Sequence, residues 1–468
     1  MSVELVPHPT PGPLVEATAT VTVFGAGRSG IAAAELLLDR GYRVRLTDST
    51  SSAELEKNCR PLAARGATIS LGEQTAAFAA GSDFIVLSPG IDERGELFAS
   101  PELDGVPVFG EIEIAYWYSP LPILAVTGTN GKSTTVSLLG LMLAEAGIKN
   151  TLAGNIGLAL CNAVRNLKDE AVLVAEISSF QLHTTESFHP RMAVLLNLSP
   201  DHLERYDTLE HYYRMKFRIF ERMGGGDLAV LNAGDREIGA RAELAGEVPA
   251  ARFSLSRHTG SLAFVEDGAV RLRAPEGGSV EVVSLDCIRL RGTHNLENVL
   301  AATAAAAACG ADEASIGRAI TGFGGLPHRL EPVDDLDGIA YFNDSKATTV
   351  DSVLRAVQSF PGPLVLIMGG RHKGSSFAPL AGELGSKARA VIAIGEAAGI
   401  IGRDLGDAVA VTGAGSLEDA LIKARKQAEA GDVVLLSPGC SSFDMFASYE
   451  ERGDEFKRIV TEMARHGR

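Results

Sequence analysis

The sequence predicts an α/β protein of three domains with mainly parallel sheets. A short buried-type strand, a glycine turn and a helix begin near residue 20 and again near residue 122, and a third series of strands follows a glycine hinge at residue 326. The 468-residue chain exceeds one typical core, since single domains usually hold about 100–200 residues. Alternation of strands with helical stretches is typical of parallel sheets covered by helices.

The first domain opens with the β-branched and aromatic run Thr20–Phe24, which predicts a buried strand. The glycine turn Gly25–Gly30 and an Ala/Leu-rich helix follow it. The next strand, Tyr42–Thr47, ends in Asp48, and a further strand is predicted at Phe84–Leu87. Strand, turn, helix and strand in this order predict the start of a parallel sheet.

The second domain opens with the strand Pro122–Thr127, the glycine loop Gly128–Ser133 and the amphipathic helix Thr134–Ala146. Further elements are predicted along the rest of this domain. They are strands at Ala171–Ile177 and Met192–Leu198, a helix at Leu209–Met223 with Asp207 as its N-cap, hairpins between about Val248 and Leu290, and a helix at Asn295–Cys309.

The hinge Gly324–Pro327 precedes the third series of short buried-type strands. These strands are predicted at Ile339–Phe342, Pro363–Met368, Ala390–Ile394 and Asp432–Leu436. We therefore place domain boundaries near residues 120 and 326, which gives domains 1–119, 120–325 and 326–468.

Composition argues against several classes of partner. The 59 acidic residues outnumber the 43 basic ones, and the net charge of −16 opposes binding to nucleic acid or to anionic membranes. No apolar run approaches the roughly 18 residues that span a bilayer, and the N-terminus lacks signal-peptide features, so we expect no membrane insertion. The five scattered cysteines form no CxxC pair, which favours a reducing, cytoplasmic location.

The strongest local motif runs from Thr127 to Thr134, between a strand and a helix. Backbone N–H groups of such a loop, with the helix N-terminus, form a cradle for phosphates. Lys132 can reach the outer phosphates, and the Ser133 hydroxyl can bind Mg²⁺. The usual pattern begins with a glycine where this sequence has Val126, so the loop is a variant of the P-loop. A plain strand-to-helix turn is the alternative.

The segment Gly25–Gly30, with Asp48 at the end of the next strand, matches a dinucleotide fingerprint in which the acid follows about 20 residues on. Taken alone, it predicts NAD and a dehydrogenase. The same turn can hold the phosphates of another nucleotide, or only pack a helix on a strand, so these alternatives stay open.

Asn155, Glu176 and His202 form a looser group of candidates. Glu176 ends one predicted strand and His202 follows another, and the carboxyl ends of parallel strands meet at a ligand crevice. An acid there suits Mg²⁺, which prefers oxygen ligands. The alternatives are a helix-capping carboxylate and a turn histidine. Lys216 lies inside a predicted helix, where the residues alone indicate a surface lysine.

Polar loops follow three strands of the last domain. They are Phe342–Thr348, Gly369–Gly374 and Ser437–Asp444. Three loops with small, polar or cationic residues suggest a second site, for a small charged substrate. Cys440 has no evident histidine partner in its turn, so we do not interpret it as a nucleophile.

A series of motifs makes the sequence similar to the Mur ligase family over nearly its whole length. They are Gly25–Gly30, Ser88–Gly90, Thr127–Thr134, Gly154–Gly157, Glu176–Leu182, Asp201–Tyr206, Gly292–Asn295, Pro327–Arg329, Asn343–Thr348 and Ser437–Phe446. The resemblance implies a Rossmann-like N-terminal domain for a UDP group, a P-loop-type central ATPase domain with a mainly parallel sheet, and a Rossmann-like C-terminal domain for an incoming amino acid. The segment 248–290 is the part least similar to the family.

The resemblance also implies a role for each candidate residue. The UDP-sugar would contact Arg28, Ser29, Asp48, Ser49 and Gly90. ATP would contact Gly128, Thr129, Asn130, Gly131, Lys132, Ser133, Thr134, Asn295, Asn298, Arg329 and Asp344. The catalytic residues would be Lys132, Asn155, His202 and Lys216, and the metal ligands Ser133, Glu176, His202 and a carbamoylated Lys216. D-Glutamate would contact Thr348, Lys373, Ser442 and Phe443.

The activity that the resemblance implies is ATP-dependent addition of D-glutamate to UDP-N-acetylmuramoyl-L-alanine, through an acyl-phosphate and with two Mg²⁺ ions, in peptidoglycan precursor synthesis. We expect a monomer that does not bind nucleic acid. Another Mur-type or folylpolyglutamate-type ligase is a close alternative. Alternatives from other classes are an NAD-dependent dehydrogenase and a P-loop switch or motor.

Overall fold

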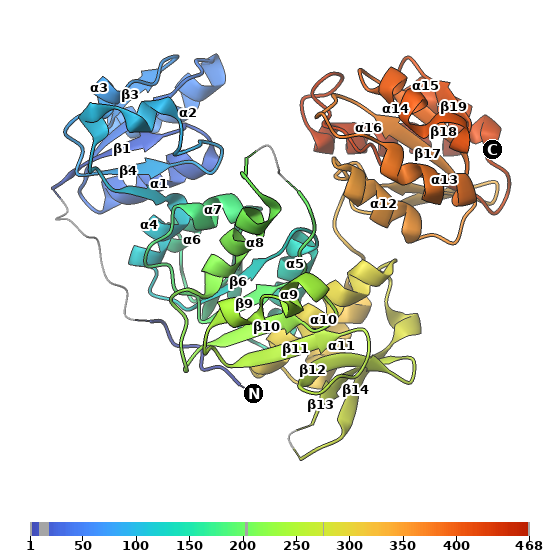
Figure 1. The fold of residues 1–468 in the computed structure, drawn as a ribbon, viewed down its shortest axis with the longest axis horizontal. Helices are drawn as coiled ribbons and strands as arrows, with labels where there is room; N and C mark the ends of the chain where they lie inside the picture. The colour runs from blue at the N-terminus through green and yellow to red at the C-terminus, as the bar shows by residue number, and fades with distance from the viewer. Residues whose placement is uncertain (1, 9–17, 202–204, 275, 467–468) are drawn as a thin grey trace. The chain divides into compact units, whose positions relative to one another are not determined.

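The computed structural model describes residues 2–8, 18–201, 205–274 and 276–466. The strands of these residues form three sheets, and the chain divides into two compact units. The first unit comprises Met1–Cys287 and Glu297–Gly322, and the second comprises Ile288–Leu296 and Phe323–Arg468. The first two sheets belong to the first unit and the third sheet to the second unit (Figure 1).

The first sheet is parallel, with the strand order β3-β2-β1-β4-β5. Its strands and connecting helices are β1 (Thr20–Phe24), α1 (Arg28–Asp39), β2 (Arg43–Asp48), α2 (Ala53–Ala64), β3 (Thr68–Leu71), α3 (Ala76–Ala79), β4 (Phe84–Leu87) and β5 (Val108–Gly110). The strand order reverses between β1 and β4. In a parallel sheet, a crevice for ligands lies at the carboxyl ends of the strands at such a reversal.

The second sheet has the order β14-β13-β12-β11-β10-β9-β6-β8-β7. Its strands are β6 (Ile123–Thr127), β7 (Asn150–Gly154), β8 (Val172–Glu176), β9 (Met192–Leu195), β10 (Leu228–Asn232), β11 (Ala250–Ser254), β12 (Ser261–Glu266), β13 (Ala269–Arg273) and β14 (Ser279–Ser284). Within the sheet, all neighbouring strands from β7 to β12 pair in parallel. Strand β13 pairs antiparallel with β12 on one side and with β14 on the other. The predicted hairpins are therefore confirmed for β12–β14, but β11 belongs to the parallel part.

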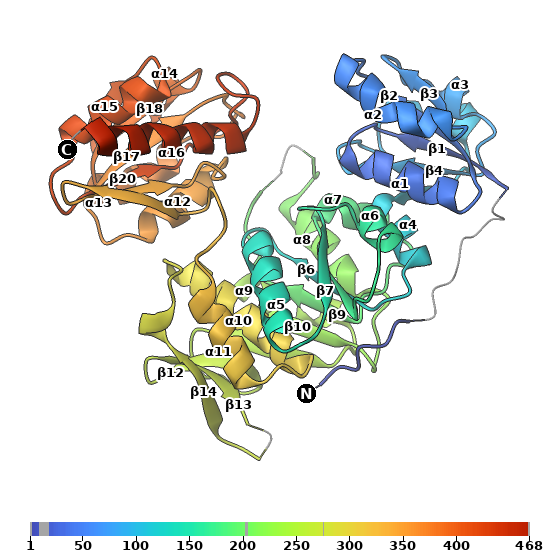
Figure 2. The same cartoon turned by 180° about the vertical axis from the view of Figure 1, so that it is seen from behind.

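Further helices follow the first sheet, connect the strands of the second sheet or come after its last strand. They are α4 (Glu111–Tyr118), α5 (Lys132–Glu145), α6 (Leu160–Arg165), α7 (Ser179–His183), α8 (Leu209–Phe217), α9 (Arg236–Gly239), α10 (Thr293–Ala308) and α11 (Glu313–Gly322). Helix α11 packs on α5 (Figure 2). Strands β6 and β8 are buried over their whole length, which places the carboxyl ends of both strands inside the domain.

The third sheet has the order β15-β16-β20-β17-β18-β19, and all its pairs are parallel except β15 with β16. Its strands are β15 (Glu331–Leu336), β16 (Ile339–Asn343), β17 (Leu364–Gly369), β18 (Ala388–Ile394), β19 (Val411–Gly413) and β20 (Val433–Leu436). Its helices are α12 (Val350–Gln358), α13 (Ala381–Lys387), α14 (Ala398–Leu405), α15 (Leu417–Gln427) and α16 (Tyr449–His466).

The predicted start and end of helix α8 need correction. Asp207 does not cap it: the N-cap is Thr208, whose side chain accepts a hydrogen bond from His211 N at 3.1 Å. The Asp207 carboxylate instead accepts from Arg94 Nη1, at 3.3 Å. The helix ends at Phe217 and passes into a 3₁₀ turn, Arg218–Phe220, so it is shorter than predicted.

Two buried carboxylates on helix α4 have opposite surroundings. Glu113 accepts hydrogen bonds from Trp117 Nε1 at 2.9 Å, Ser187 N at 2.8 Å and Phe188 N at 3.0 Å. Glu111 Oε1 accepts from Cys161 N at 2.5 Å, whereas its Oε2 is buried without a partner among the described residues. Burial therefore raises the pKa of Glu111 to about 7.

We predict that Glu111→Gln stabilises the protein above neutral pH. Because the pKa of Glu111 is raised in the folded state, the native protein still holds a proton between about pH 5 and 7, where the unfolded chain has lost it. The free energy of unfolding therefore falls as pH rises through this window. An uncharged amide avoids that loss, so the variant should gain about 1–2 kcal/mol at pH 8 and little at pH 5. Urea unfolding at both values measures it.

Glu113→Gln on the same helix is the matched control. It removes charge from a carboxylate that accepts several hydrogen bonds, so it should destabilise the protein at pH 8. Equal effects of the two variants would contradict the distinction between the two side chains.

The start of the chain lies by the second sheet rather than by the first, as both views show (Figures 1 and 2). Val3 N donates to Ala308 O at 2.9 Å, at the end of α10. Arg191 Nε donates to Val6 O at 3.0 Å. Residues 2–8 therefore bind to the central sheet before the chain enters β1.

Within the described ranges, none of the helices combines the length and the apolar character that crossing a bilayer requires.

Candidate functional site

The loop Gly128–Gly131 joins the buried strand β6 to helix α5, as the phosphate-loop prediction requires. Gly131 has φ +86°, and a Cβ there would lie 2.1 Å from Asn298 Oδ1. Gly128 has φ +149°, and its Cβ would lie 2.9 Å from Leu196 Cβ. Both positions therefore need glycine, because a side chain would be strained and would meet close neighbours.

Residues after strand β9 hold this loop from outside. Asn130 N donates to Asn197 Oδ1 at 2.9 Å, and Asn197 Nδ2 donates back to Asn130 O at 3.1 Å. Thr129 Oγ1 donates to Ser199 O at 3.2 Å. Asn197 was not predicted as a site residue, although its place after a strand next to β6 was a usable signal.

Two lysines meet at the loop. Lys132 Nζ donates to Gly128 O and Thr129 O, at 2.9 Å each, and Lys216 Nζ donates to Gly128 O at 3.0 Å. Lys216 is only 2 % exposed and lies over the Tyr212 ring, with Nζ 4.6 Å from the ring centroid. Burial, with the Lys132 charge adding to it, lowers the pKa of Lys216 well below its usual range.

The interpretation of Lys216 as a surface lysine is therefore wrong. Helix α8 turns Tyr212, Tyr213 and Lys216 inward together. The resemblance had implied a functional role for Lys216, but the residue pattern could not, because a lysine within a polar helix is most often exposed.

A serine, a glutamate and an asparagine from three segments form a hydrogen-bonded row. Ser133 Oγ donates to Glu176 Oε2 at 2.7 Å. Asn155 Nδ2 donates to Glu176 Oε1 at 2.8 Å. Glu176 and Ser133 are 2 % and 3 % exposed. The row thus starts at the first turn of α5, where phosphates would bind, and ends at the turn after β7.

The side-chain oxygens of Ser133 and Glu176 in this row are suitable ligands for a magnesium ion. A carboxylate and a hydroxyl oxygen lie side by side at the start of α5, and Mg²⁺ takes oxygen ligands, commonly a carboxylate with a serine or threonine hydroxyl beside phosphate. The predicted ligand His202 lies outside the described residues.

A pocket of about 530 Å³ lies at the carboxyl ends of the first sheet. Its lining consists of Gly25, Gly27, Arg28, Ser29, Asp48, Ser49, Gln74, Ser88, Pro89, Gly90, Ile91 and Asn155. All five residues predicted for the UDP-sugar are among them, whereas Gln74 and Ser88 were not predicted as contacts. Asn155 lies in the turn after β7 of the second sheet, so the pocket reaches the hydrogen-bonded row.

The hydrogen bonds of Asp48 and Arg28 order this pocket. Asp48 Oδ2 accepts from Ala26 N at 2.7 Å and Oδ1 accepts from Thr50 N at 2.9 Å. The Asp48 carboxylate therefore orders the glycine turn. Arg28 Nη2 donates to Asn155 O at 3.1 Å, which ties the start of α1 to the turn after β7.

The remaining ATP candidates are divided between the two units. Asn298 lies in the first unit, where Thr135 Oγ1 donates to its Oδ1 at 3.4 Å. Asn295, Arg329 and Asp344 lie in the second unit. Asp344 is buried and accepts from Ser437 Oγ at 2.9 Å, and its burial raises its pKa to about 7. The Arg329 Nε atom is buried without a partner among the described residues.

The three polar loops of the second unit follow the adjacent strands β16, β20 and β17 and are bonded to one another. Arg371 N donates to Ser441 O at 3.0 Å, and Gly439 N donates to Ala347 O at 2.8 Å. The loops thus meet at the carboxyl ends of these three strands. The four D-glutamate candidates differ in exposure: Ser442 is buried, Thr348 half-buried, and Lys373 and Phe443 exposed.

Comparisons with known proteins identify the family. Three family models match: Mur ligase MurD-like, N-terminal domain over residues 19–110, Mur ligase middle domain over 126–306, and Mur ligase, glutamate ligase domain over 328–440. The UDP-N-acetylmuramoylalanine–D-glutamate ligase of Pelotomaculum thermopropionicum is 40% identical over 446 residues, which cover 94% of this chain and 97% of that protein. The chain belongs to the Mur ligase family.

A further relative and two solved structures are also similar to this chain. The UDP-N-acetylmuramoylalanine–D-glutamate ligase of Salinibacter ruber is 41% identical over 449 residues, covering 94% of this chain and 97% of that one. Two solved structures share the fold at a TM-score of 0.60. One is a pseudomurein peptide ligase type C from Methanothermus fervidus, which is 19% identical and covers 95% of this chain and 100% of that one. The other is MurF ligase from Thermotoga maritima in complex with ADP, which is 16% identical and covers 90% of this chain and 95% of that one.

As a Mur ligase the chain is an ATP-dependent amide ligase. The alternatives of an NAD-dependent dehydrogenase and of a P-loop switch or motor are therefore wrong. The dinucleotide-like motif Gly25–Gly30 is not specific to NAD. It indicates only a strand-to-helix turn whose backbone can approach phosphates, and several nucleotide-binding folds share such a turn.

Arg452 is a buried residue of this Mur ligase that the sequence analysis did not identify. It lies on α16, beyond the matched C-terminal model, and is 1 % exposed. Its guanidinium donates to Ser345 Oγ at 3.0 Å, Ser345 O at 2.9 Å and Cys440 O at 3.2 Å, with longer bonds to Gly369 O and Ser441 O. One side chain therefore joins all three polar loops.

We predict that Arg452→Met lowers the free energy of unfolding by about 2–3 kcal/mol, because buried acceptors lose their donor. Urea unfolding of the full chain measures it. Arg458→Met is the matched control, since Arg458 lies on the same helix and pairs with Glu455 and Glu462 at the surface. A loss no larger than that of the control would contradict the predicted role.

Proposed function

We propose that the chain joins D-glutamate to UDP-N-acetylmuramoyl-L-alanine with ATP, through an acyl-phosphate, in peptidoglycan precursor synthesis in the cytoplasm. The names of relatives about 40% identical over nearly the whole chain support the substrates. The ADP complex of the MurF structure supports the nucleotide. We also propose that domain boundaries near residues 120 and 326 separate the UDP-binding, ATP-binding and amino-acid-binding parts.

The observation that carries the proposal is the shared position of Asn155. Asn155 lines the pocket of the first sheet, and its side chain donates to Glu176, which accepts from Ser133 at the phosphate loop. A nucleotide-sugar in the pocket and a triphosphate on the loop would thus meet at the Asn155–Glu176–Ser133 row. This is the arrangement that transfer of a phosphoryl group to the sugar's carboxylate requires.

The proposed reaction has two steps. The substrate carboxylate attacks the γ-phosphorus of ATP, the bond to the β-phosphate oxygen breaks, and ADP leaves. The amine of D-glutamate then attacks the acyl carbon, and phosphate leaves with formation of the amide. Phosphoryl transfer needs positioning and neutralisation of charge more than covalent help. Lys132, the loop amides and the start of α5 supply positive charge for the phosphates.

Ser133 and Glu176 would hold one Mg²⁺, which when bound neutralises charge on the phosphates. A second would be held by His202 and a carbamoylated Lys216. Burial favours that modification, because CO₂ reacts with a neutral amine, and the pKa of Lys216 is well below its usual range. The product is a carbamate anion with two oxygens, formed with loss of one proton.

The polar loops of the second unit would receive D-glutamate. Thr348, Lys373, Ser442 and Phe443 all lie on these loops. The exposed Lys373 ammonium would pair with a substrate carboxylate, a charge-assisted hydrogen bond typically worth about 1.5–3 kcal/mol. Asn295, Arg329 and Asp344 are proposed as ATP contacts of this unit.

The test is ADP release with UDP-N-acetylmuramoyl-L-alanine, with and without D-glutamate. We expect ADP release to depend on both substrates and to yield an amide product. A panel of other amino acids tests the alternative of a different Mur-type or folylpolyglutamate-type ligase. Turnover that requires another amino acid, or ATP hydrolysis unaffected by the nucleotide-sugar, would contradict the proposal.

A further inference from the structure

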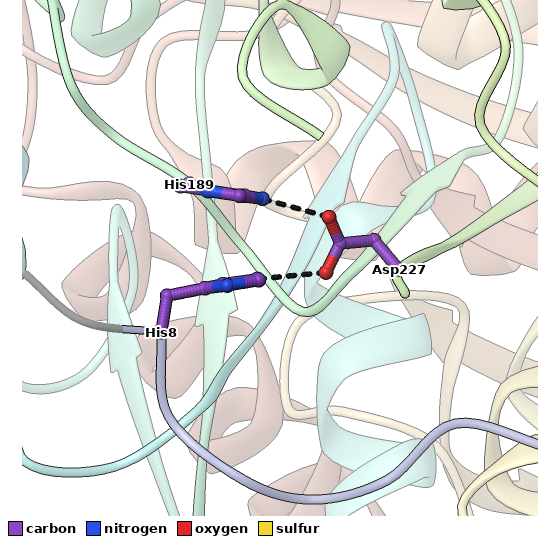
Figure 3. A group of neighbouring side chains, drawn as sticks. All are labelled: His8, His189 and Asp227. Carbon is purple, nitrogen blue, oxygen red and sulfur yellow. Dashed lines mark hydrogen bonds and ion pairs between the residues drawn. The ribbon is translucent and has the colours of Figure 1, made fainter. Parts of the chain in front are cut away.

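Two histidines and an aspartate from distant parts of the chain meet away from the ligase site. His8 Nε2 lies 2.7 Å from Asp227 Oδ1, and His189 Nε2 lies 2.7 Å from Asp227 Oδ2 (Figure 3). His8 belongs to the first residues of the chain, His189 precedes β9 and Asp227 precedes β10. The cluster therefore fastens the N-terminal segment to the central sheet.

The two imidazole rings present their nitrogens in the same direction. The rings are stacked, with centroids 3.5 Å apart and planes inclined by 17°. Both Nε2 atoms point at the Asp227 carboxylate (Figure 3). One donor atom from each of the three residues fits within a span of 4.8 Å, which is close enough for one ion to touch all three.

Other groups hold the carboxylate in place. Gly224 N donates to Asp227 Oδ2 at 2.7 Å, and Arg191 Nη1 donates to Oδ1 at 3.2 Å. The side chain of Asp227 is 1 % exposed, and those of His8 and His189 are 15 % and 22 % exposed. A buried, oriented carboxylate beside two partly exposed imidazoles resembles a metal site, in which outer hydrogen bonds fix the ligands and water completes the coordination.

We propose that His8, His189 and Asp227 form a binding site for a divalent transition-metal ion of the zinc class. Two imidazole nitrogens and one carboxylate oxygen are a ligand set typical of zinc, with water as the fourth ligand. Magnesium and calcium prefer all-oxygen sites, so the nitrogen donors select against them. The ion would take the place of the two Nε2 protons through which the rings hydrogen-bond to the Asp227 carboxylate.

The charge around the cluster agrees with nitrogen ligation. A neutral imidazole carries one N–H and one lone pair, so moving the proton from Nε2 to Nδ1 leaves Nε2 free to bind the ion. The charges of Asp227 and Arg191 offset one another. The cluster therefore has no excess negative charge that would attract magnesium or calcium ions regardless of ligand type. The competing interpretation is a hydrogen-bonded clasp without metal.

The experiment titrates ZnCl₂ into the full-length protein by calorimetry, with excess MgCl₂ present to occupy the proposed magnesium ligands. We expect about one ion per chain, and loss of this binding in His8→Ala and in His189→Ala. His258→Ala is the matched control, because His258 is exposed in the loop between β11 and β12. The control should bind as the original protein does.

Two further measurements keep the result independent of folding defects. Cobalt(II) should give the visible absorption of a low-symmetry nitrogen–oxygen site in the original protein and not in the His8→Ala variant. Zinc should raise the Tm of the original protein and leave that of the His8→Ala variant unchanged. Absence of zinc uptake, or uptake equal in all variants, would overturn the proposal and leave only a hydrogen-bonded clasp.

Discussion

Replacing Lys132 with alanine is expected to lower the rate of ADP release about 10²- to 10³-fold, the usual effect of removing one preorganised charge from a transition state. Lys132 Nζ lies on the carbonyls of Gly128 and Thr129, at the mouth of the phosphate cradle. Its loss removes one of the positive charges that, together with the proposed Mg²⁺, would offset charge on the transferred phosphoryl group. ADP release with both substrates present measures the effect.

Lys149→Ala is the control for this change. Lys149 is an exposed lysine of the same domain that pairs with Asp169 at the surface, so its loss should leave the rate nearly unchanged. Undiminished turnover of Lys132→Ala would contradict the phosphate role. Because Lys216 also donates to Gly128 O, the loop retains a donor in the variant, and unfolding curves should show that it is folded.

Lys216→Ala is expected to lower the rate by about 10²-fold or more, and short carboxylic acids should restore part of it. If Lys216 acts as a carbamate, its contribution is a carboxylate-like group at the end of a buried side chain. The truncated side chain leaves room for acetate or formate near the Gly128 carbonyl. Initial rates with increasing acetate, at constant ionic strength, measure the recovery.

Two comparisons make the recovery specific. Lys132→Ala should not respond to acetate, because that lysine is proposed to act as a cation. Lys216→Arg should stay inactive with acetate, since the guanidinium fills the space and cannot form the carbamate. Loss of activity in Lys216→Ala without any recovery would count against the carbamate.

The interior strands could be predicted from the sequence, whereas most edge strands could not. Strands β1 and β4 coincide with the predicted ranges, because buried parallel strands are short apolar runs between turns. The overlooked strands β3, β5, β7, β15 and β19 all lie at edges of their sheets. Edge strands are short and carry polar residues or proline, as in Glu331–Leu336, so they lack the apolar signal.

Strand β10 is an exception that could have been predicted. It is the buried run Leu228–Asn232 in the interior of the second sheet, and its pattern matches the strands that were identified. The start of α8 was misjudged for a different reason. Asp207 and Thr208 are both good N-caps, and the choice depends on Arg94, which lies far away in sequence and pairs with Asp207.

The site was predictable where its chemistry lies in local motifs. The phosphate loop and Glu176 at the end of β8 follow from strand–loop–helix patterns. Arg452 and the burial of Lys216 were not predictable from residues alone, because each depends on which helix face packs inward. The cluster of His8 with Asp227 joins residues 219 positions apart, and no local pattern indicates it.

The binding of residues 2–8 to the central sheet has a consequence for how the protein is made. Val3 donates to Ala308, so this segment binds to a surface that is synthesised some 300 residues after it. At about 5–20 residues per second, the delay is roughly 15–60 s. The nascent segment therefore stays undocked while the first sheet folds, and it reaches its final position only after translation has passed α10.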